Sequence, residues 1–180
     1  MARIIFGKGY KFMKRNGILN REISRIIASM GHGQYLLVCD AGFPIPEDAD
    51  CVDLSLKKGV PDLPTVLSTI NEEFISEKVM FAPETKSNNQ PLYNELEKIF
   101  AEVDFEEIPH EKILNEIAVE ARAIIRTGDY NPWGNIVLQA GTDPYAWFEK
   151  DGLKMPDFYK QRIKNIEEAD KRDMFYKSEE

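Results

Sequence analysis

The feature that most constrains the fold of this chain is a continuous apolar run, Tyr-Leu-Leu-Val-Cys, at residues 35–39. Gly33 lies just before the run, and the polar turn sequence Asp40-Ala41-Gly42 ends it. The short length, the flanking glycines and the lack of polar alternation are typical of a strand that is buried on both faces. We therefore expect a strand of a parallel sheet that is covered by helices on both sides.

The rest of the chain alternates between short apolar segments and amphipathic ones. Further strands are expected over residues 51–54, 78–82, 105–109 and 135–139. Helices are expected over residues 21–30, around 66–70, from 91 to 100 and over 111–126, with a polar, turn-rich connection over 84–90. Strands that alternate with helices predict an α/β fold, a single layered domain with a mostly parallel sheet flanked by helices.

The first expected helix has recognisable ends as well as an apolar face. Asn20 is a plausible N-cap, and Gly31 is well placed to end the helix. The apolar face repeats at helical spacing through Ile23, Ile26, Ile27 and Met30. This pattern predicts that the helix packs on the sheet.

The pattern changes at both ends of the chain. Residues 1–12 show no clean hydrophobic period, whereas Met13 opens a segment that reads like a natural start, so we expect 1–12 to be a disordered or dispensable extension. The domain itself is expected to span 13–141. Residues 142–180 carry several aromatic side chains and then a highly charged stretch. We expect a C-terminal helical extension that packs on the domain or on a neighbouring subunit, with a solvated helix as the alternative.

Charge and composition exclude several classes of function. The chain has 31 acidic and 23 basic residues and a net charge of −8, which disfavours a nucleic-acid partner. No segment approaches the roughly 20 apolar residues that a membrane span needs, and the apolar run at 4–6 is too short for a signal-peptide core. The two cysteines, Cys39 and Cys51, show no zinc spacing. We expect a reduced, cytoplasmic protein without nucleic-acid or membrane partners.

Common catalytic motifs are also absent from the sequence. No phosphate-binding glycine pattern follows a predicted strand, and neither a Gly-x-Ser-x-Gly elbow nor a His-Glu-x-x-His zinc motif occurs. Nucleotide-dependent, hydrolase and metalloprotease functions therefore have no support. We expect no cofactor and no metal site.

Two polar residues flank the predicted buried strand. His32 lies between glycines before the strand, and its ordinary role would be to end a helix, where the dipole favours it. Asp40 ends the apolar run, at the end of the strand where ligands gather in open α/β sheets. Asp40 could equally cap a turn.

The second half of the chain holds further candidates. His110 follows Pro109 and precedes a predicted helix, so by itself it could be an ordinary loop residue. Trp133, Gly134 and Asn135 lie between a tight turn and the last predicted strand. Taken singly, Trp133 is typical of a core residue and Asn135 of a turn residue.

Together these segments resemble one family. The segments MKRNGILN (13–20), Gly31-His32, LVCDAGFPIP (37–46), GVP (59–61), IIRTG (124–128) and NIVLQAG (135–141) are similar to the D-ribose pyranase branch of the ribose pyranase and fucose mutarotase family. The pairing of a Gly-His turn with V-C-D-A-G-x-P-I-P is specific. The resemblance covers residues 13–141.

The resemblance implies a role for each matching residue. His32 matches a general acid, and Asp40 and His110 match sugar-binding groups. Trp133, Gly134 and Asn135 match a three-residue sugar-contacting segment in which the family usually has Tyr at the position of Trp133. Tryptophan keeps a stacking face but exchanges a hydroxyl for an N–H, and the Met-Gly-His-Gly turn also resembles the fucose branch, so the substrate stays open between a pentose and a deoxyhexose.

The expected function is interconversion of the ring forms or anomers of a free monosaccharide, without a cofactor, by general acid–base opening and reclosure of the hemiacetal. Histidine, with an unperturbed pKa near 6.5, suits such proton transfer. The resemblance also implies a homo-oligomer, decameric in the ribose branch, with sites at subunit contacts. The alternative is a non-catalytic sugar-binding or regulatory protein with the same pocket.

Overall fold

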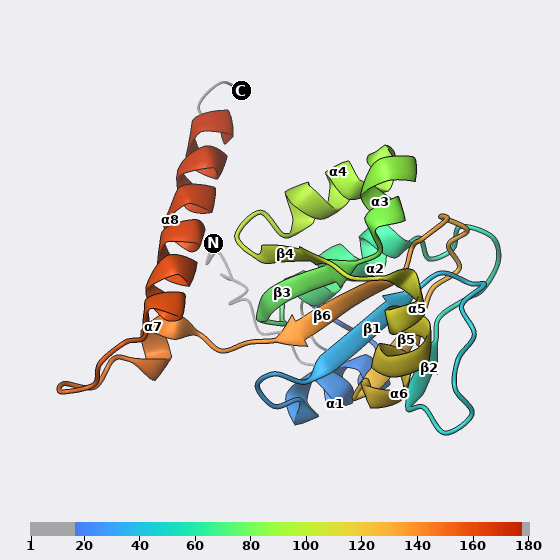
Figure 1. Cartoon of the computed structure of the whole chain (residues 1–180), viewed down its shortest axis with the longest axis horizontal. Helices are drawn as coiled ribbons and strands as arrows, with labels where there is room; N and C mark the ends of the chain where they lie inside the picture. Colours follow the sequence, from blue (N-terminus) through green and yellow to red (C-terminus); the bar gives the residue numbers. More distant parts are fainter. Residues whose placement is uncertain (1–16, 178–180) are drawn as a thin grey trace, which may run out of the picture.

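The computed structural model describes residues 17–177 and the side chains up to residue 171. Residues 1–12, which the sequence predicts to be dispensable, lie outside the described residues. The described chain folds around a six-stranded mixed sheet with helices on both faces (Figure 1). This architecture confirms the predicted α/β class.

The elements alternate along the chain as the sequence predicts. The strands are β1 (Tyr35–Cys39), β2 (Cys51–Asp53), β3 (Ser76–Phe81), β4 (Asp104–Glu107), β5 (Ala123–Arg126) and β6 (Ile136–Ala140). The helices are α1 (Arg21–Ser29), α2 (Leu63–Asn71), α3 (Pro83–Asn88), α4 (Gln90–Ile99), α5 (His110–Lys112), the π-helix η1 (Ile113–Ile117), α6 (Ala118–Glu120), α7 (Pro144–Trp147) and α8 (Asp157–Lys177).

The directions of the strands define two opposite sides of the sheet, one at each end of β1. The order is β2-β5-β1-β6-β3-β4, and β6 runs antiparallel to both of its neighbours while the other pairs are parallel. We call the side where β1 ends and β6 begins the carboxyl edge. The side where β1 begins and β6 ends is the amino edge. Residues near the two ends of β1 therefore lie on opposite sides of the molecule.

The predicted buried strand is the centre of the core. Leu36 and Val38 face the layer formed by α1, α2 and α4, whereas Leu37 and Cys39 face the layer formed by the segment 110–120. All four side chains are fully buried. Burial of each large apolar side chain is worth about 1.5–3 kcal/mol, so this strand anchors both layers and fixes the positions of its two ends.

The sequence prediction of one long helix over 111–126 is wrong. The helical segment ends at Glu120, and Ala123–Arg126 forms β5, which pairs with both β1 and β2. Ile124 and Ile125 are both fully buried but belong to opposite core layers, as expected for a strand with a period of two. Their spacing from Ile117 also fits a helix, which explains the error.

Two local predictions also need correction. The segment predicted as a turn-rich connection over 84–90 contains α3, which begins at Pro83. Gly31 does not end α1, because the C-cap is Met30 in an extended conformation, and the positive φ of this turn, 81°, is at Gly33. Asn20 does cap α1, since its side chain accepts hydrogen bonds from the backbone of Glu22 and Ile23.

The chain beyond β6 leaves the sheet at the amino edge and ends in the long helix α8 (Figure 1). Tyr159 of α8 is buried against Phe148, with ring centroids 4.9 Å apart. The amide of Asn165 donates to Asp104 of β4 over 3.0 Å. The Tyr159 contact lies within the extension, whereas Asn165 reaches β4 and Arg162, which donates to the Ser76 carbonyl over 3.4 Å, reaches β3. Within residues 17–177, no helix is both long and apolar enough to cross a membrane.

Candidate active site

Three of the predicted site residues meet at the carboxyl edge. Asp40 follows the last residue of β1, Asn135 precedes the first residue of β6, and His110 is the first residue of α5. Because β1 and β6 are adjacent and antiparallel, the end of one lies beside the start of the other. The fold thereby joins Asp40 to Asn135 across 95 positions of sequence.

The buried amide of Asn135 connects the other two groups. Asn135 as a whole is 4% exposed. In the amide orientation that gives both atoms a partner, Nδ2 donates to Oδ2 of Asp40 over 3.3 Å and to the carbonyl of Gly134 over 3.2 Å. The other amide atom lies 3.4 Å from Nε2 of His110. Asn135 therefore holds a carboxylate and an imidazole on either side of one amide.

The carboxyl group of Asp40 is only partly buried. Burial raises its pKa above the ordinary value, while hydrogen bonds from the backbone of Gly42 and from Asn135 oppose the rise. The Gly42 N–H donates to Oδ1 over 2.7 Å. A carboxylate held in this way has oxygen lone pairs left to accept hydroxyl groups.

Side chains that the sequence did not single out support the turn after β1. The guanidinium Nε of Arg126 donates to the Ala41 carbonyl over 3.1 Å, and the Thr127 hydroxyl donates to the Cys39 carbonyl over 2.9 Å. Arg126 is the last residue of β5, the strand that was predicted to be helical, and Thr127 follows it. Their only signal in the sequence was their place in the segment 124–128, which resembles the family.

The loop before β6 holds Trp133 in a costly conformation. Trp133 has a φ of 57°, which is uncommon for a bulky residue and costs about 1–3 kcal/mol. Its carbonyl accepts a hydrogen bond from the Thr85 hydroxyl over 2.9 Å, and Asn89 donates to the preceding Pro132 carbonyl over 2.9 Å. Strain that neighbouring residues maintain is typical of functional loops.

Gly134 is required by this loop. A Cβ atom at Gly134 would lie 2.8 Å from the carbonyl oxygen of Asn131, closer than a side chain tolerates. The loop therefore needs glycine between Trp133 and Asn135 to keep both of them near the carboxyl edge.

A hollow opens beside Asp40. It has a volume of about 360 Å³ and is lined by residues 40–42 and 130–132. Small-molecule sites commonly occupy a few hundred cubic ångströms. The hollow places the predicted carboxylate where a small polar ligand can reach it.

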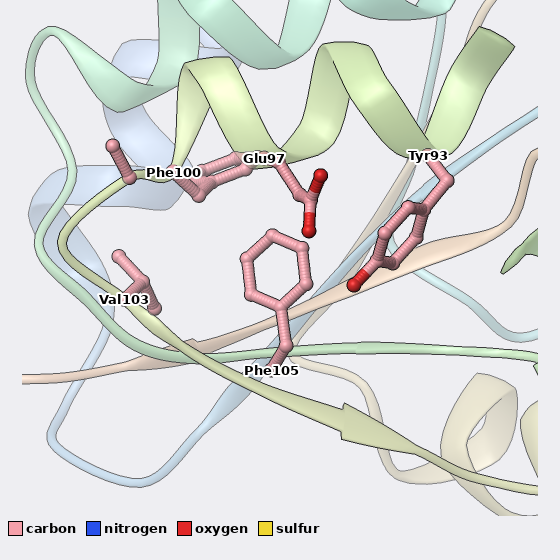
Figure 2. Close-up of a pocket in the computed structure, with 6 residues that line it drawn as sticks. Tyr93, Glu97, Phe100, Val103 and Phe105 are labelled. Atoms are coloured by element: carbon pink, nitrogen blue, oxygen red, sulfur yellow. The ribbon is translucent and has the colours of Figure 1, made fainter. Parts of the chain in front are cut away.

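A second hollow, of about 390 Å³, lies between α4 and β4 at the far end of the sheet (Figure 2). Its walls include the rings of Tyr93 and Phe105, which also pack edge-on against Phe81 of the core. Figure 2 shows Glu97 of α4 pointing toward Phe105. None of the predicted site residues lines it, so we do not assign the site there.

His32 lies at the amino edge, away from the other candidates. Its Nε2 is 2.8 Å from Oε2 of Glu77, which is near the start of β3. The five residues of β1 separate the two edges, a span of about 16 Å at the usual rise per residue. Within one chain, the fold does not bring His32 to Asp40.

The two cysteines differ in character from the carboxyl-edge cluster: Cys39 is buried in the core and Cys51 is half-buried. Burial raises the pKa of the Cys39 thiol far above its ordinary value, and burial also raises the pKa of Cys51. Both cysteines are free. Within the described range, no group of three or more His, Cys, Asp or Glu side chains could hold a metal ion. The chemistry at the carboxyl edge is therefore that of a carboxylate, an imidazole, an amide and an indole, which suits a ligand with several hydroxyl groups.

Comparison with known proteins finds relatives that cover most of this chain. The chain is 54% identical over 150 residues to a protein named D-ribose pyranase 2 from Rubrobacter xylanophilus, a match that covers 83% of this chain and 97% of the relative. It is 44% identical over 151 residues to D-ribose pyranase 1 from Streptomyces griseus, covering 84% of this chain and the whole relative.

Solved structures give the same fold. The structure of Bacillus subtilis RbsD in complex with D-ribose superimposes with a TM-score of 0.69 at 39% identity, covering 73% of this chain and 99% of that one. A fucose mutarotase from Streptococcus pneumoniae, solved with L-fucose, shares the fold at a TM-score of 0.53 and 18% identity, covering 69% of this chain and 94% of that one. The family model described as the RbsD / FucU transport protein family matches residues 13–143, so the chain belongs to that family.

Proposed function

We propose that this protein is an enzyme that interconverts the ring forms of a free monosaccharide, with D-ribose as the first candidate. The observation that carries the proposal is the convergence of Asp40, His110 and Asn135 beside a hollow at the carboxyl edge. The chain that makes this arrangement is 54% identical to a protein named D-ribose pyranase. Ribose comes ahead of fucose because the likeness to the fucose mutarotase is only 18%.

The reaction requires proton transfer and little else. The hemiacetal opens when the anomeric hydroxyl loses a proton and the ring oxygen gains one, and a different hydroxyl then attacks the carbonyl. General acid–base groups accelerate such steps about 10²- to 10⁴-fold. No electrons or groups leave the sugar, so the mechanism calls for no cofactor.

Each carboxyl-edge residue has a binding role in this mechanism. Asp40 accepts hydrogen bonds from sugar hydroxyls, and Asn135 orients Asp40 and His110 at the same time. His110 binds a further hydroxyl. Trp133, with Gly134 behind it, offers an aromatic face to an apolar face of the sugar.

His32 is the general acid in this proposal, and its position calls for a second copy of the chain. His32 and Asp40 lie at opposite edges of the sheet, so one chain alone cannot present both to one sugar. In a ring of identical subunits, the amino edge of one copy can face the carboxyl edge of the next. We therefore propose a homo-oligomer with sites between subunits.

We also propose a reducing, cytoplasmic location, which the two free cysteines support.

The alternative is a sugar-binding protein without turnover. One observation favours it: the three proposed binding residues meet within a single chain, whereas His32 is paired with Glu77 at the other edge. Such a protein would bind ribose and leave the exchange between ring forms at its rate in water.

Saturation-transfer NMR on D-ribose separates these functions. The proposal predicts faster exchange between pyranose and furanose signals when the wild-type protein is added. Binding of ribose with no change in exchange would overturn the catalytic proposal and leave the binding alternative.

A further inference from the structure

The ring of His32 is held by the C-terminal extension as well as by the domain. Trp147, the last residue of α7, meets the imidazole edge-on, with ring centroids 5.7 Å apart and an interplanar angle of 75°. Trp147 is 54% exposed, so its ring keeps a solvent-facing side beside His32. The sequence predicted an extension but gave no sign of which residue it would contact.

The extension also reaches the carboxylate that pairs with His32. Oε2 of Glu77 is 2.8 Å from His32 Nε2 and 3.8 Å from Nη1 of Arg162 on α8. Glu77 and Arg162 are both buried, with side chains 9% and 8% exposed. A buried carboxylate needs a partner charge, and Arg162 supplies it from the extension.

Arg162 is itself fixed in place. Its Nη1 donates to the Thr142 carbonyl over 3.2 Å and its Nη2 donates to the Ser76 carbonyl over 3.4 Å. Bonds to the start of the extension and to the start of β3 leave the guanidinium little freedom. The series Arg162, Glu77 and His32 therefore runs from α8 to the amino edge through groups with defined positions.

This pairing selects one nitrogen of the imidazole. A carboxylate only accepts hydrogen bonds, so Nε2 of His32 must carry the proton that it donates to Glu77. Nδ1 is then the nitrogen that remains for proton exchange with a ligand. Trp147 lies against the edge of the ring, where it can oppose a flip that would exchange the two nitrogens.

We propose that Glu77 and two residues of the C-terminal extension, Arg162 and Trp147, are positioning residues that hold His32 with Nδ1 directed to the sugar. The proposal deepens the function given above and rests on it for the catalytic role of His32. The contacts of the His32 imidazole with Glu77 and Trp147 do not depend on that catalytic role. The extension would then be part of the catalytic apparatus rather than an appendage.

The test uses the full-length protein and two variants. Glu77→Gln removes the charge that fixes the Nε2 proton, and Trp147→Ala removes the ring contact. Tyr145→Ala is the matched control, because Tyr145 lies on the same short helix and is similarly exposed, at 50%. Thermal melting verifies that each variant is folded.

The first readout is the ¹⁵N spectrum of the imidazoles. The chain has only two histidines, so His110 serves as an internal reference for His32. The wild type should show the Nε2–H form of His32, and Glu77→Gln should add a population of the Nδ1–H form with the His110 signals unchanged. A His32 signature that stays the same in both Glu77→Gln and Trp147→Ala would overturn the proposal.

The second readout is ribose exchange at saturating sugar. Glu77→Gln should lower the maximal rate about 10- to 100-fold, the scale expected for a misplaced catalytic group. Trp147→Ala should lower it about 2- to 10-fold, as for loss of an aromatic pair. Tyr145→Ala should have no effect, and the dissociation constant for ribose should be unchanged in all three.

The two readouts distinguish failure of this proposal from failure of the proposed function. If the wild type does not accelerate ribose exchange, the function is wrong, and the ¹⁵N signature alone decides whether the extension positions His32. If the signature changes but the rate does not, or if the rate falls only through weaker ribose binding, the positioning role is refuted.

Discussion

The two edges of the sheet are built in different ways. At the carboxyl edge, Asp40 and Asn135 sit directly at the ends of two core strands, β1 and β6, and their positions follow from strand pairing. At the amino edge, His32 lies in a glycine-flanked turn, where it contacts Glu77 and, from the extension, Trp147. Arg162 of the extension reaches Glu77 rather than His32 itself. The comparison teaches that the core specifies the binding groups, whereas the proposed proton donor depends on packing by a segment outside the core.

The largest difference between the two edges is expected when His32 is changed. His32→Ala should reduce the enzymatic part of ribose exchange about 10²- to 10⁴-fold, the contribution of a general acid–base group. The side chain is 40% exposed, so the fold should be retained. Exchange measured by saturation-transfer NMR gives the rate, and the ribose dissociation constant should stay within a small factor of wild type. An unchanged rate would remove His32 from the mechanism.

Asp40→Asn should act at the other edge and mainly on binding. Hydrogen bonds to a charged group are worth about 1.5–3 kcal/mol, so we expect ribose affinity to fall about 10- to 100-fold. Calorimetric titration measures this directly. If affinity is unchanged, Asp40 does not contact the sugar.

The pH dependence of binding should also separate the edges. Burial raises the pKa of Asp40 above its ordinary value of 3.8, and the ionised form is the stronger acceptor of hydrogen bonds from hydroxyl groups. Ribose binding should therefore weaken, as the pH falls, at a higher pH than an exposed aspartate would give. In Asp40→Asn this acidic limb should disappear.

The same shift has a consequence for stability. A carboxyl group whose pKa is raised by folding contributes stability that is present below its unfolded-state pKa and lost as the pH rises through its folded-state pKa. Asp40→Asn cannot ionise and so avoids this loss of stability. The melting temperature of the variant should exceed that of the wild type at about pH 7 and match it at about pH 3. An equal difference at both pH values would contradict the burial effect.

A smaller effect is expected where the loop before β6 is held. Thr85→Val keeps the shape of the side chain but removes the hydrogen bond to the Trp133 carbonyl. We expect a loss of about 0.5–1.5 kcal/mol in unfolding free energy, with a modest loss of ribose affinity. Denaturant unfolding measures the first, and Ser87→Ala, an exposed change on the same helix, is the control.

The sequence predicts more of the carboxyl edge than of the amino edge. The apolar runs beside Asp40 and Asn135 predicted the two strands that these residues flank, whereas their proposed roles came from the resemblance to the family, because each could by itself be a turn residue. The strand β5 was missed because Ile117 and Ile124 also fit one face of a helix, and the π-helix that ends at Ile117 has no clear signal in sequence.

The supports of His32 were beyond the reach of local patterns. Glu77 is the second residue of β3 and Arg162 lies in a charged helix, and both resemble ordinary surface residues in sequence. Their meeting depends on where α8 packs against the start of β3, which is a long-range property of the fold. The resemblance to the family could not supply it either, because the resemblance ends at residue 141.

The central claim is that one site takes His32 from one subunit and Asp40 from another. Subunit complementation tests it most directly: His32→Ala and Asp40→Asn chains are unfolded together, reassembled as a mixture and assayed at low ribose. If the residues come from different chains, about one quarter of the sites regain both wild-type groups, and exchange should rise to about that fraction of the wild-type rate. A mixture no more active than the separately reassembled variants would contradict the claim.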